Sequence, residues 1–225
     1  VKELKALNRI TTAAKGPYTT VLGGSKVTDR IEAIEALISN NRADQVLLSG
    51  LIANVFFKAA NKIKYKLGIG GEDKIVENAK ALLAKYPQVF ELPRDIAIEQ
   101  NGERKEISIE ELDKGDAILD IGSKTIDAYS RIIRSSGTIF MSGPAGVFEK
   151  KGFEVGTEGL LRAMASSFGT TIVSGGHLTV ALQRFGIKEW IDHVSTSGGA
   201  LVLYLAGKRL PLIEALEKSA MRVKK

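Results

Sequence analysis

The chain has 225 residues, of which 44% are hydrophobic and 26% are charged, and this composition excludes an intrinsically disordered chain. It contains no cysteine, so disulfide bonds and thiolate metal sites are excluded. The net charge is +6, but basic and acidic residues are interspersed, which favours small phosphorylated ligands over nucleic acid.

The first residues lack the apolar core of a secretory signal, and no apolar run approaches the ~18 residues of a membrane helix. We therefore expect a cytoplasmic protein that has neither a membrane nor a nucleic acid as a partner.

One arrangement recurs along the chain: a short apolar run, then glycine or serine, then a segment with helical periodicity. The first run is residues 19–22, and Gly23 and Gly24 follow it. In the helix expected after them, isoleucine or leucine at 31, 34, 37 and 38 forms the apolar face, and Thr28 or Asp29 is the expected N-cap.

The second run is residues 46–48, after which Ser49 and Gly50 lead into a helical pattern over 51–67. Another helix is expected over 73–86. Between residues 80 and 112 the pattern breaks, and alternating residues on either side of Asn101-Gly102 predict a β-hairpin. We expect this hairpin to form a small antiparallel excursion at the edge of a sheet.

Four further units follow. Their apolar runs are residues 117–121, 138–141, 171–173 and 193–196, and each leads into glycine or into serine and glycine. The run at 138–141 leads into SGPAGVFE at 142–149, which by itself indicates either a turn or a surface that holds a ligand. A helix around 157–168 is expected after it.

Short, nearly continuous apolar runs are typical of strands buried on both faces, and their alternation with helices predicts right-handed crossovers. The sequence therefore predicts one α/β domain over residues 1–225: a doubly wound, six-stranded parallel sheet with helices on both faces and a small antiparallel hairpin. Ligands of such sheets bind beyond the carboxyl ends of the strands, where glycine permits close approach and helix N-termini attract phosphate.

Two familiar phosphate motifs do not occur. No G-x-x-x-x-G-K-[ST] is present and no G-x-G-x-x-G follows a predicted strand, so a dinucleotide-binding domain is not indicated. Lys26 follows the first strand at a helix start, where it could meet a phosphate or be a surface lysine. His177 and His193 are the only histidines, and the sequence predicts no metal cluster and no catalytic triad.

Six motifs carry a resemblance to a known family. LGGSKVTDRI, SGLIANVFFKA, LDIGSKTI, SGPAGVFE, TIVSGGH and HVSTSGGA occur in the order found in the C-terminal half of phosphoglycerate kinase, and the similarity covers residues 18–216. The resemblance implies the domain that binds ADP or ATP with Mg²⁺, without the N-terminal domain that binds the triose. It also implies the family's reaction, in which ADP and 1,3-bisphosphoglycerate interconvert with ATP and 3-phosphoglycerate.

The resemblance implies roles for single residues. Lys26 resembles the family's lysine that follows the transferring phosphoryl group, and Gly176 and Gly199 resemble backbone donors to its oxygens. Glu149 resembles the carboxylate that accepts the ribose hydroxyls. The other residues implied in nucleotide binding are Gly23, Gly24, Ser25, Arg30, Leu119, Pro144, Val147, Gly175, His177 and Leu178, together with Gly176 itself.

The chain also departs from the family's pattern. Arg30 stands where the family usually has a lysine, and Leu51 stands for a glycine. His177 stands where many members have an aspartate that contacts the magnesium-nucleotide, which leaves the metal contact open because Mg²⁺ prefers oxygen ligands. The alternative function is a non-catalytic nucleotide-binding module that senses or scaffolds.

Overall fold

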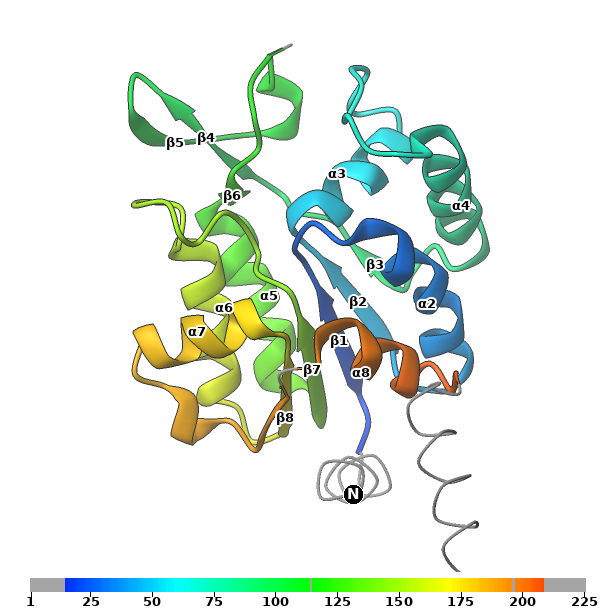
Figure 1. The fold of residues 1–225 in the computed structure, drawn as a ribbon, viewed down its shortest axis with the longest axis vertical. Coiled ribbons are helices and arrows are strands. Elements are labelled where there is room, and N and C mark those ends of the chain that lie inside the picture. Colours follow the sequence, from blue (N-terminus) through cyan, green and yellow to red (C-terminus); the bar gives the residue numbers. More distant parts are fainter. Residues whose placement is uncertain (1–14, 114, 196, 209–225) are drawn as a thin grey trace, which may run out of the picture.

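The computed structural model describes residues 15–113, 115–195 and 197–208 (Figure 1). Its centre is a six-stranded sheet in the order β3-β2-β1-β7-β8-β9, in which every neighbouring pair is parallel. The strands are β1 (Tyr18–Leu22), β2 (Gln45–Leu48), β3 (Phe90–Glu91), β7 (Thr138–Ser142), β8 (Thr170–Ser174) and β9 (His193–Ser195). The predicted six-stranded parallel sheet is confirmed.

Helices cover both faces of this sheet. One face carries α2 (Val27–Ser39), α3 (Gly50–Ala59), α4 (Glu72–Lys85) and α8 (Gly198–Leu205), and the other carries α5 (Ser123–Ser135), α6 (Val155–Ala165) and α7 (Gly176–Arg184) (Figure 1). Successive strand residues point to opposite faces, so Leu22 packs in the first core cluster and its neighbour Val21 in the second. The predicted doubly wound arrangement is thereby confirmed.

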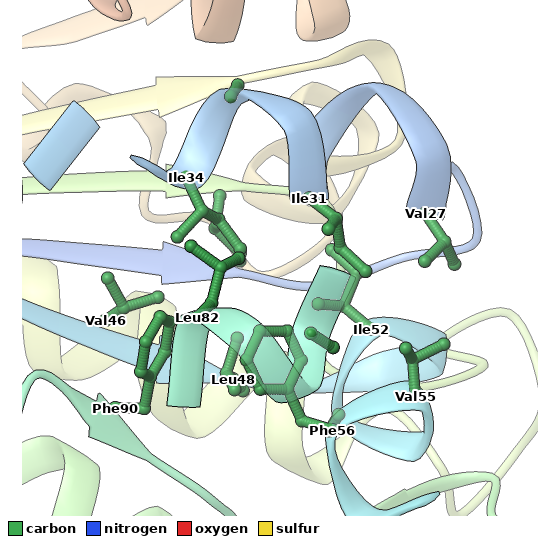
Figure 2. Packing of buried hydrophobic residues seen from close by; sticks show 14 of the residues in the cluster. Val27, Ile31, Ile34, Val46, Leu48, Ile52, Val55, Phe56, Leu82 and Phe90 are labelled. Carbon is green, nitrogen blue, oxygen red and sulfur yellow. The ribbon is translucent and has the colours of Figure 1, made fainter. Parts of the chain in front are cut away.

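The larger core lies between the sheet and α2, α3 and α4. Figure 2 shows Ile31 of α2 beside Ile52 of α3, and Ile34 of α2 beside Leu82 of α4. The rings of Phe56 and Phe90 lie 5.0 Å apart between centroids and tilt by 39°. This packing attaches the two-residue strand β3 to the edge of the sheet beyond β2.

The assignment of residues 117–121 to the parallel sheet is wrong. Only β6 (Asp120–Ile121) forms a strand there, and it pairs antiparallel with β4 (Ile96–Gln100). With β5 (Glu103–Ile107) these strands make a separate three-stranded sheet in the order β5-β4-β6. The sixth place in the parallel sheet belongs to β3 instead.

Two interactions explain why this run leaves the main sheet. The N–H of Leu119 donates to the carbonyl of Ala97 at 2.9 Å, so the run is hydrogen-bonded to the hairpin. Asp120, the fourth residue of the run, is buried, and its carboxylate pairs with Arg104 of β5 at 2.9 Å. A buried carboxylate needs such a partner, and the parallel sheet offers apolar surroundings on both faces.

The hairpin itself is confirmed. Strands β4 and β5 pair from Gln100 with Glu103 to Ile96 with Ile107, and Asn101 and Gly102 have φ values of 53° and 81°. Two successive positive φ values define the turn that Asn-Gly favours. The hairpin is part of the second sheet rather than an excursion at the edge of the first. Short 3₁₀ turns lie after β5 at Ile109–Glu111 and after α7 at Lys188–Trp190.

Three helix boundaries differ from the sequence prediction. Helix α2 begins at Val27, ahead of Thr28, and Lys26 occupies its N-cap position. Helix α3 ends at Ala59 rather than continuing to residue 67, because Asn61 adopts a left-handed conformation with φ of 59°. Helix α6 ends at Ala165, and the expected helix over 73–86 is present as α4. Within the predicted strand over 193–196, Thr196 lies outside the described residues.

Over residues 15–113, 115–195 and 197–208, none of the helices is both long and apolar enough to cross a membrane.

Candidate functional site

The strand order reverses between β1 and β7, whose carboxyl ends lie side by side. In open parallel sheets, this reversal opens a crevice in which ligands bind. The two loops that follow these strands are tied together here. The N–H of Gly23 donates to the carbonyl of Ser142 at 2.9 Å, and the N–H of Gly24 donates to the carbonyl of Pro144 at 2.7 Å.

Glycine is required where these two loops touch. A Cβ atom on Gly23 would lie 2.2 Å from the carbonyl oxygen of Pro144. One on Gly143 would lie 2.4 Å from the carbonyl oxygen of Gly23, and Gly143 also has a positive φ of 83°. The glycines of the two motifs therefore bring the loops into backbone contact, which no other residue type would allow.

A first cavity of about 260 Å³ opens between these loops and α3. We call it the apolar cavity, because its walls are mainly the side chains of Leu51, Phe57, Ile96, Leu119 and Val147. An apolar cavity of this size suits a heterocyclic ring system.

Two carboxylates lie in the wall of the apolar cavity. Asp120 is buried and held by Arg104 and by the N–H of Gly156 at 2.7 Å. Burial raises the pKa of this carboxyl group to about 6, against the opposing effect of Gly156 and Arg104. Glu149, in contrast, is exposed, and its carboxylate makes no ion pair within the described part of the chain. Of these two carboxylates, Glu149 is the one whose oxygens are exposed to a ligand.

A second cavity of about 250 Å³ adjoins the first, and we call it the basic cavity. Three basic side chains line it: Lys26, Arg30 and His177. The Arg30 side chain is buried, and its Nη2 donates to Ser142 Oγ at 3.4 Å. Lys26 is exposed and also lines a third cavity, of about 340 Å³, between the start of α2 and Ile69.

Two helices begin at the basic cavity. Gly176 starts α7 and Gly198 starts α8, and both glycines line the cavity. The first N–H groups of a helix have no partner within the helix, and the helix dipole places positive potential at this end. The cavity therefore combines backbone donors with three cationic or potentially cationic side chains, which is the chemistry that binds phosphate.

The structure brings nearly all the predicted site residues together around the two cavities. Four of them line both cavities: Gly24, Ser25, Pro144 and His177. The apolar cavity alone has Leu119, Val147 and Glu149, and the basic cavity alone has Lys26, Arg30, Gly175, Gly176, Leu178 and Gly199. Gly23 is the exception: it is buried behind the contact between the loops and lines neither cavity.

Sequence reasoning missed several residues of the apolar cavity. Leu51, Asn54 and Phe57 line it from one face of α3, three residues apart in sequence. Their spacing, directly after the Ser49-Gly50 pair, was the available signal. Arg104, which holds Asp120, gave no such signal, because it reaches the site from a different sheet.

The residues of the basic cavity do not fit a Mg²⁺ ion held by the protein. Its lining contains no aspartate or glutamate. Among the residues that the structure describes, no three His, Asp or Glu side chains gather in a way that could hold a metal. Mg²⁺ requires oxygen ligands, usually including a carboxylate, and Lys26, Arg30 and His177 offer none.

Comparisons with known proteins agree on one family. A family model described as phosphoglycerate kinase matches residues 1–208. The phosphoglycerate kinase of Methanothermus fervidus is 39% identical over 229 residues, which cover 98% of this chain and 55% of that protein. The phosphoglycerate kinase of Methanobacterium bryantii is 40% identical over 232 residues, which cover 100% of this chain and 56% of that protein.

Solved structures of the same family have the same fold. The crystal structure of phosphoglycerate kinase from Pyrococcus horikoshii OT3 matches with a TM-score of 0.86 at 34% identity, over 98% of this chain and 56% of that one. The enzyme from Coxiella burnetii matches with a TM-score of 0.83 at 32% identity, over 95% of this chain and 56% of that one. The chain thus spans about half the length of the relatives that it matches.

Proposed function

Because the chain belongs to the phosphoglycerate kinase family, we propose that it binds ADP or ATP and forms the nucleotide-binding half of a phosphoglycerate kinase. In this proposal, residues 1–225 are one nucleotide-binding domain that acts in the cytoplasm. The phosphoglycerate would be bound by a second domain of the kind that makes up the rest of the relatives' length.

One observation carries the proposal: the apolar and the basic cavity adjoin at the reversal of strand order and share the wall formed by Gly24, Ser25, Pro144 and His177. A nucleotide has the same two parts, an apolar base and a chain of phosphates. The base would lie in the apolar cavity between Pro144 and α3, and the phosphates would extend toward the starts of α7 and α8. Glu149, at the wall between base and solvent, would accept the ribose hydroxyls.

The reaction would transfer a phosphoryl group between two oxygens. The bond between this group and the carboxyl oxygen of 1,3-bisphosphoglycerate breaks, and a new bond forms to a β-phosphate oxygen of ADP. The protein contributes mainly alignment and charge stabilisation to such transfers. Lys26 would stabilise the charge on the transferring group, because it is exposed and lines the basic cavity. The N–H groups of Gly176 and Gly199 would hold the phosphate oxygens.

The relatives favour a kinase over a sensor or scaffold, since each of those compared above is named a phosphoglycerate kinase. Mg²⁺ accompanies nucleotides in such kinases, where it neutralises phosphate charge. In this chain it would enter with the nucleotide, since the basic cavity has no carboxylate to hold it.

Replacement of Glu149 by glutamine tests the nucleoside part of the site. We expect Glu149→Gln to weaken ADP binding by about 1–2 kcal/mol, because the carboxylate forms charge-assisted hydrogen bonds to hydroxyl groups. Titration calorimetry measures the affinity. Glu158→Gln is the matched control, because Glu158 pairs with Arg162 on α6 and lines neither cavity. Equal affinities for ADP in the wild-type chain and Glu149→Gln would remove Glu149 from the site.

A further inference from the structure

The basic cavity is lined by basic side chains and by no acidic ones, which is unusual for a site that binds a magnesium-nucleotide complex. Lys26, Arg30 and His177 line it, together with the N-termini of α7 and α8. Every one of these groups attracts an anion, and no carboxylate stands among them. A polyphosphate can therefore be neutralised by the protein alone.

Around His177, too, the basic cavity presents cationic side chains and no carboxylate. The imidazole is exposed and lines both cavities. Its ring centroid lies 6.2 Å from that of Phe148. Arg30 and Lys26 line the basic cavity with it. Glu149 lines the apolar cavity but not the basic cavity, and in the proposed function it binds the ribose.

The second carboxylate of the apolar cavity, Asp120, is already hydrogen-bonded within the fold. Asp120 is buried, and its Oδ2 accepts from Arg104 at 2.9 Å and from the N–H of Gly156 at 2.7 Å. Its Oδ1 accepts the N–H of Ile121 at 2.9 Å, so both oxygens are held inside the fold. No oxygen of Asp120 is therefore left to hold a metal beside the phosphates.

We propose that this chain binds the phosphates of ADP through Arg30, His177 and the N-termini of α7 and α8, so that its affinity for ADP does not depend on Mg²⁺. His177 is the residue that decides this, because it lines the basic cavity in the first turn of α7 and offers a nitrogen where an oxygen ligand would be needed for the metal. The inference rests on the proposed nucleotide site and specifies how that site neutralises phosphate.

The physical reason is competition for the same charge. Free ADP carries more negative charge than its magnesium complex, and a cavity lined by cations gains most from the more negative form. Mg²⁺ then adds little to binding and removes part of the attraction. A carboxylate at position 177 would reverse the balance, because it would repel free ADP and attract the metal complex.

The test measures ADP affinity by titration calorimetry on the full 225-residue chain, once with Mg²⁺ and once with a chelator. For the wild-type chain we expect the two dissociation constants to agree within about threefold, or the metal-free one to be the lower. For His177→Asp we expect metal-free binding to weaken by about tenfold or more and Mg²⁺ to restore it, because the new carboxylate repels phosphate. His177→Asn is the matched control, since it has the shape of aspartate without its charge, and it should keep the wild-type independence of Mg²⁺.

The outcomes separate this inference from the proposed function. If Mg²⁺ tightens wild-type ADP binding by more than about threefold, the inference is wrong while the nucleotide site stands. The same holds if His177→Asp, folded as judged by circular dichroism, binds ADP as independently of Mg²⁺ as the wild type. If the wild-type chain binds no ADP under either condition, the proposed function itself fails and the inference with it.

Discussion

At the scale of single residues, Lys26 combines an exposed ammonium group with a fixed backbone position. It occupies the N-cap position of α2, directly after the loop in which Gly23 and Gly24 bond to the β7 loop. It lines the basic cavity and the neighbouring cavity beside Ile69. In the proposed site, a side chain so placed would act on the phosphoryl group that is transferred.

Replacement of Lys26 by alanine separates binding from catalysis. In the 225-residue chain we expect ADP affinity to fall by no more than about threefold, because the lysine acts chiefly on charge that develops in the transition state. In a two-domain enzyme that carries this chain as its nucleotide half, we expect Lys26→Ala to lower kcat by about 10²-fold or more. Calorimetry and a coupled kinetic assay measure the two effects. A near-normal kcat would make Lys26 an ordinary surface residue.

At the scale of elements, the hairpin of β4 and β5 supports the apolar cavity through one ion pair. Arg104 Nη1 donates to Asp120 Oδ2 at 2.9 Å and to the carbonyl of Gly152 at 3.1 Å, and its Nη2 donates to the carbonyl of Ile121 at 2.8 Å. Asp120 in turn accepts the N–H of Gly156 at the start of α6. One side chain of the small sheet thus ties together β6, the loop before α6 and α6 itself.

The pKa of Asp120 makes this support dependent on pH. Burial raises the pKa of the carboxyl group from 3.8 to about 6 in the folded chain. Between these values the unfolded chain is ionised while the folded chain keeps its proton, so the contribution of Asp120 to stability falls as the pH rises from about 4 to 6. A shift of this size corresponds to about 3 kcal/mol.

We expect Arg104→Met to destabilise the fold by about 3–5 kcal/mol at pH 8, because it leaves a buried charge without its partner. At pH 5 the loss should be smaller, because Asp120 is then mostly protonated in the folded chain. Denaturant unfolding at the two pH values measures the free energies of unfolding. In an Asp120→Asn background the difference between the two pH values should disappear. An equal loss at pH 5 and pH 8 in the Arg104→Met chain would contradict this account of the ion pair.

At the scale of the whole molecule, the chain spans about half the length of its relatives, and the proposed function gives it one of two substrate sites. The two cavities that would bind the nucleotide both open at the carboxyl ends of the parallel strands, where β1 and β7 meet. A phosphoryl acceptor and donor must be held in line for transfer. The proposed nucleotide half therefore supplies one of the two substrates in the required orientation.

The purified 225-residue chain should bind ADP and yet show essentially no phosphoglycerate kinase turnover. Loss of the second binding surface removes the alignment of the substrates, which accounts for rate factors of roughly 10⁵ or more in oriented reactions. A coupled assay with 1,3-bisphosphoglycerate and ADP measures the rate, and a complete kinase of the same family serves as the positive control. Robust turnover by the chain alone would overturn the proposal that two halves are needed.

Much of the fold was predictable because it depends on local sequence patterns. Apolar runs such as 19–22 and 138–141 are buried on both faces, and the helices between them carry one apolar face each, so a parallel sheet covered on both sides is the arrangement that buries them all. The turn at Asn101-Gly102 was predictable for an equally local reason, since that pair favours positive φ. The glycines after the strands likewise indicated the edge at which the cavities lie.

Two features were decided only by the tertiary structure, because each depends on a contact between residues that are distant in sequence. The run at 117–121 has the apolar pattern of a central strand, but it pairs with the hairpin, because Asp120 finds its counter-charge in Arg104 there. The need for glycine at position 23 also follows from contact through space, because a Cβ there would lie 2.2 Å from the carbonyl oxygen of Pro144. Desolvation and steric fit act on the atoms that folding brings together, and a linear pattern of residue types does not contain those distances.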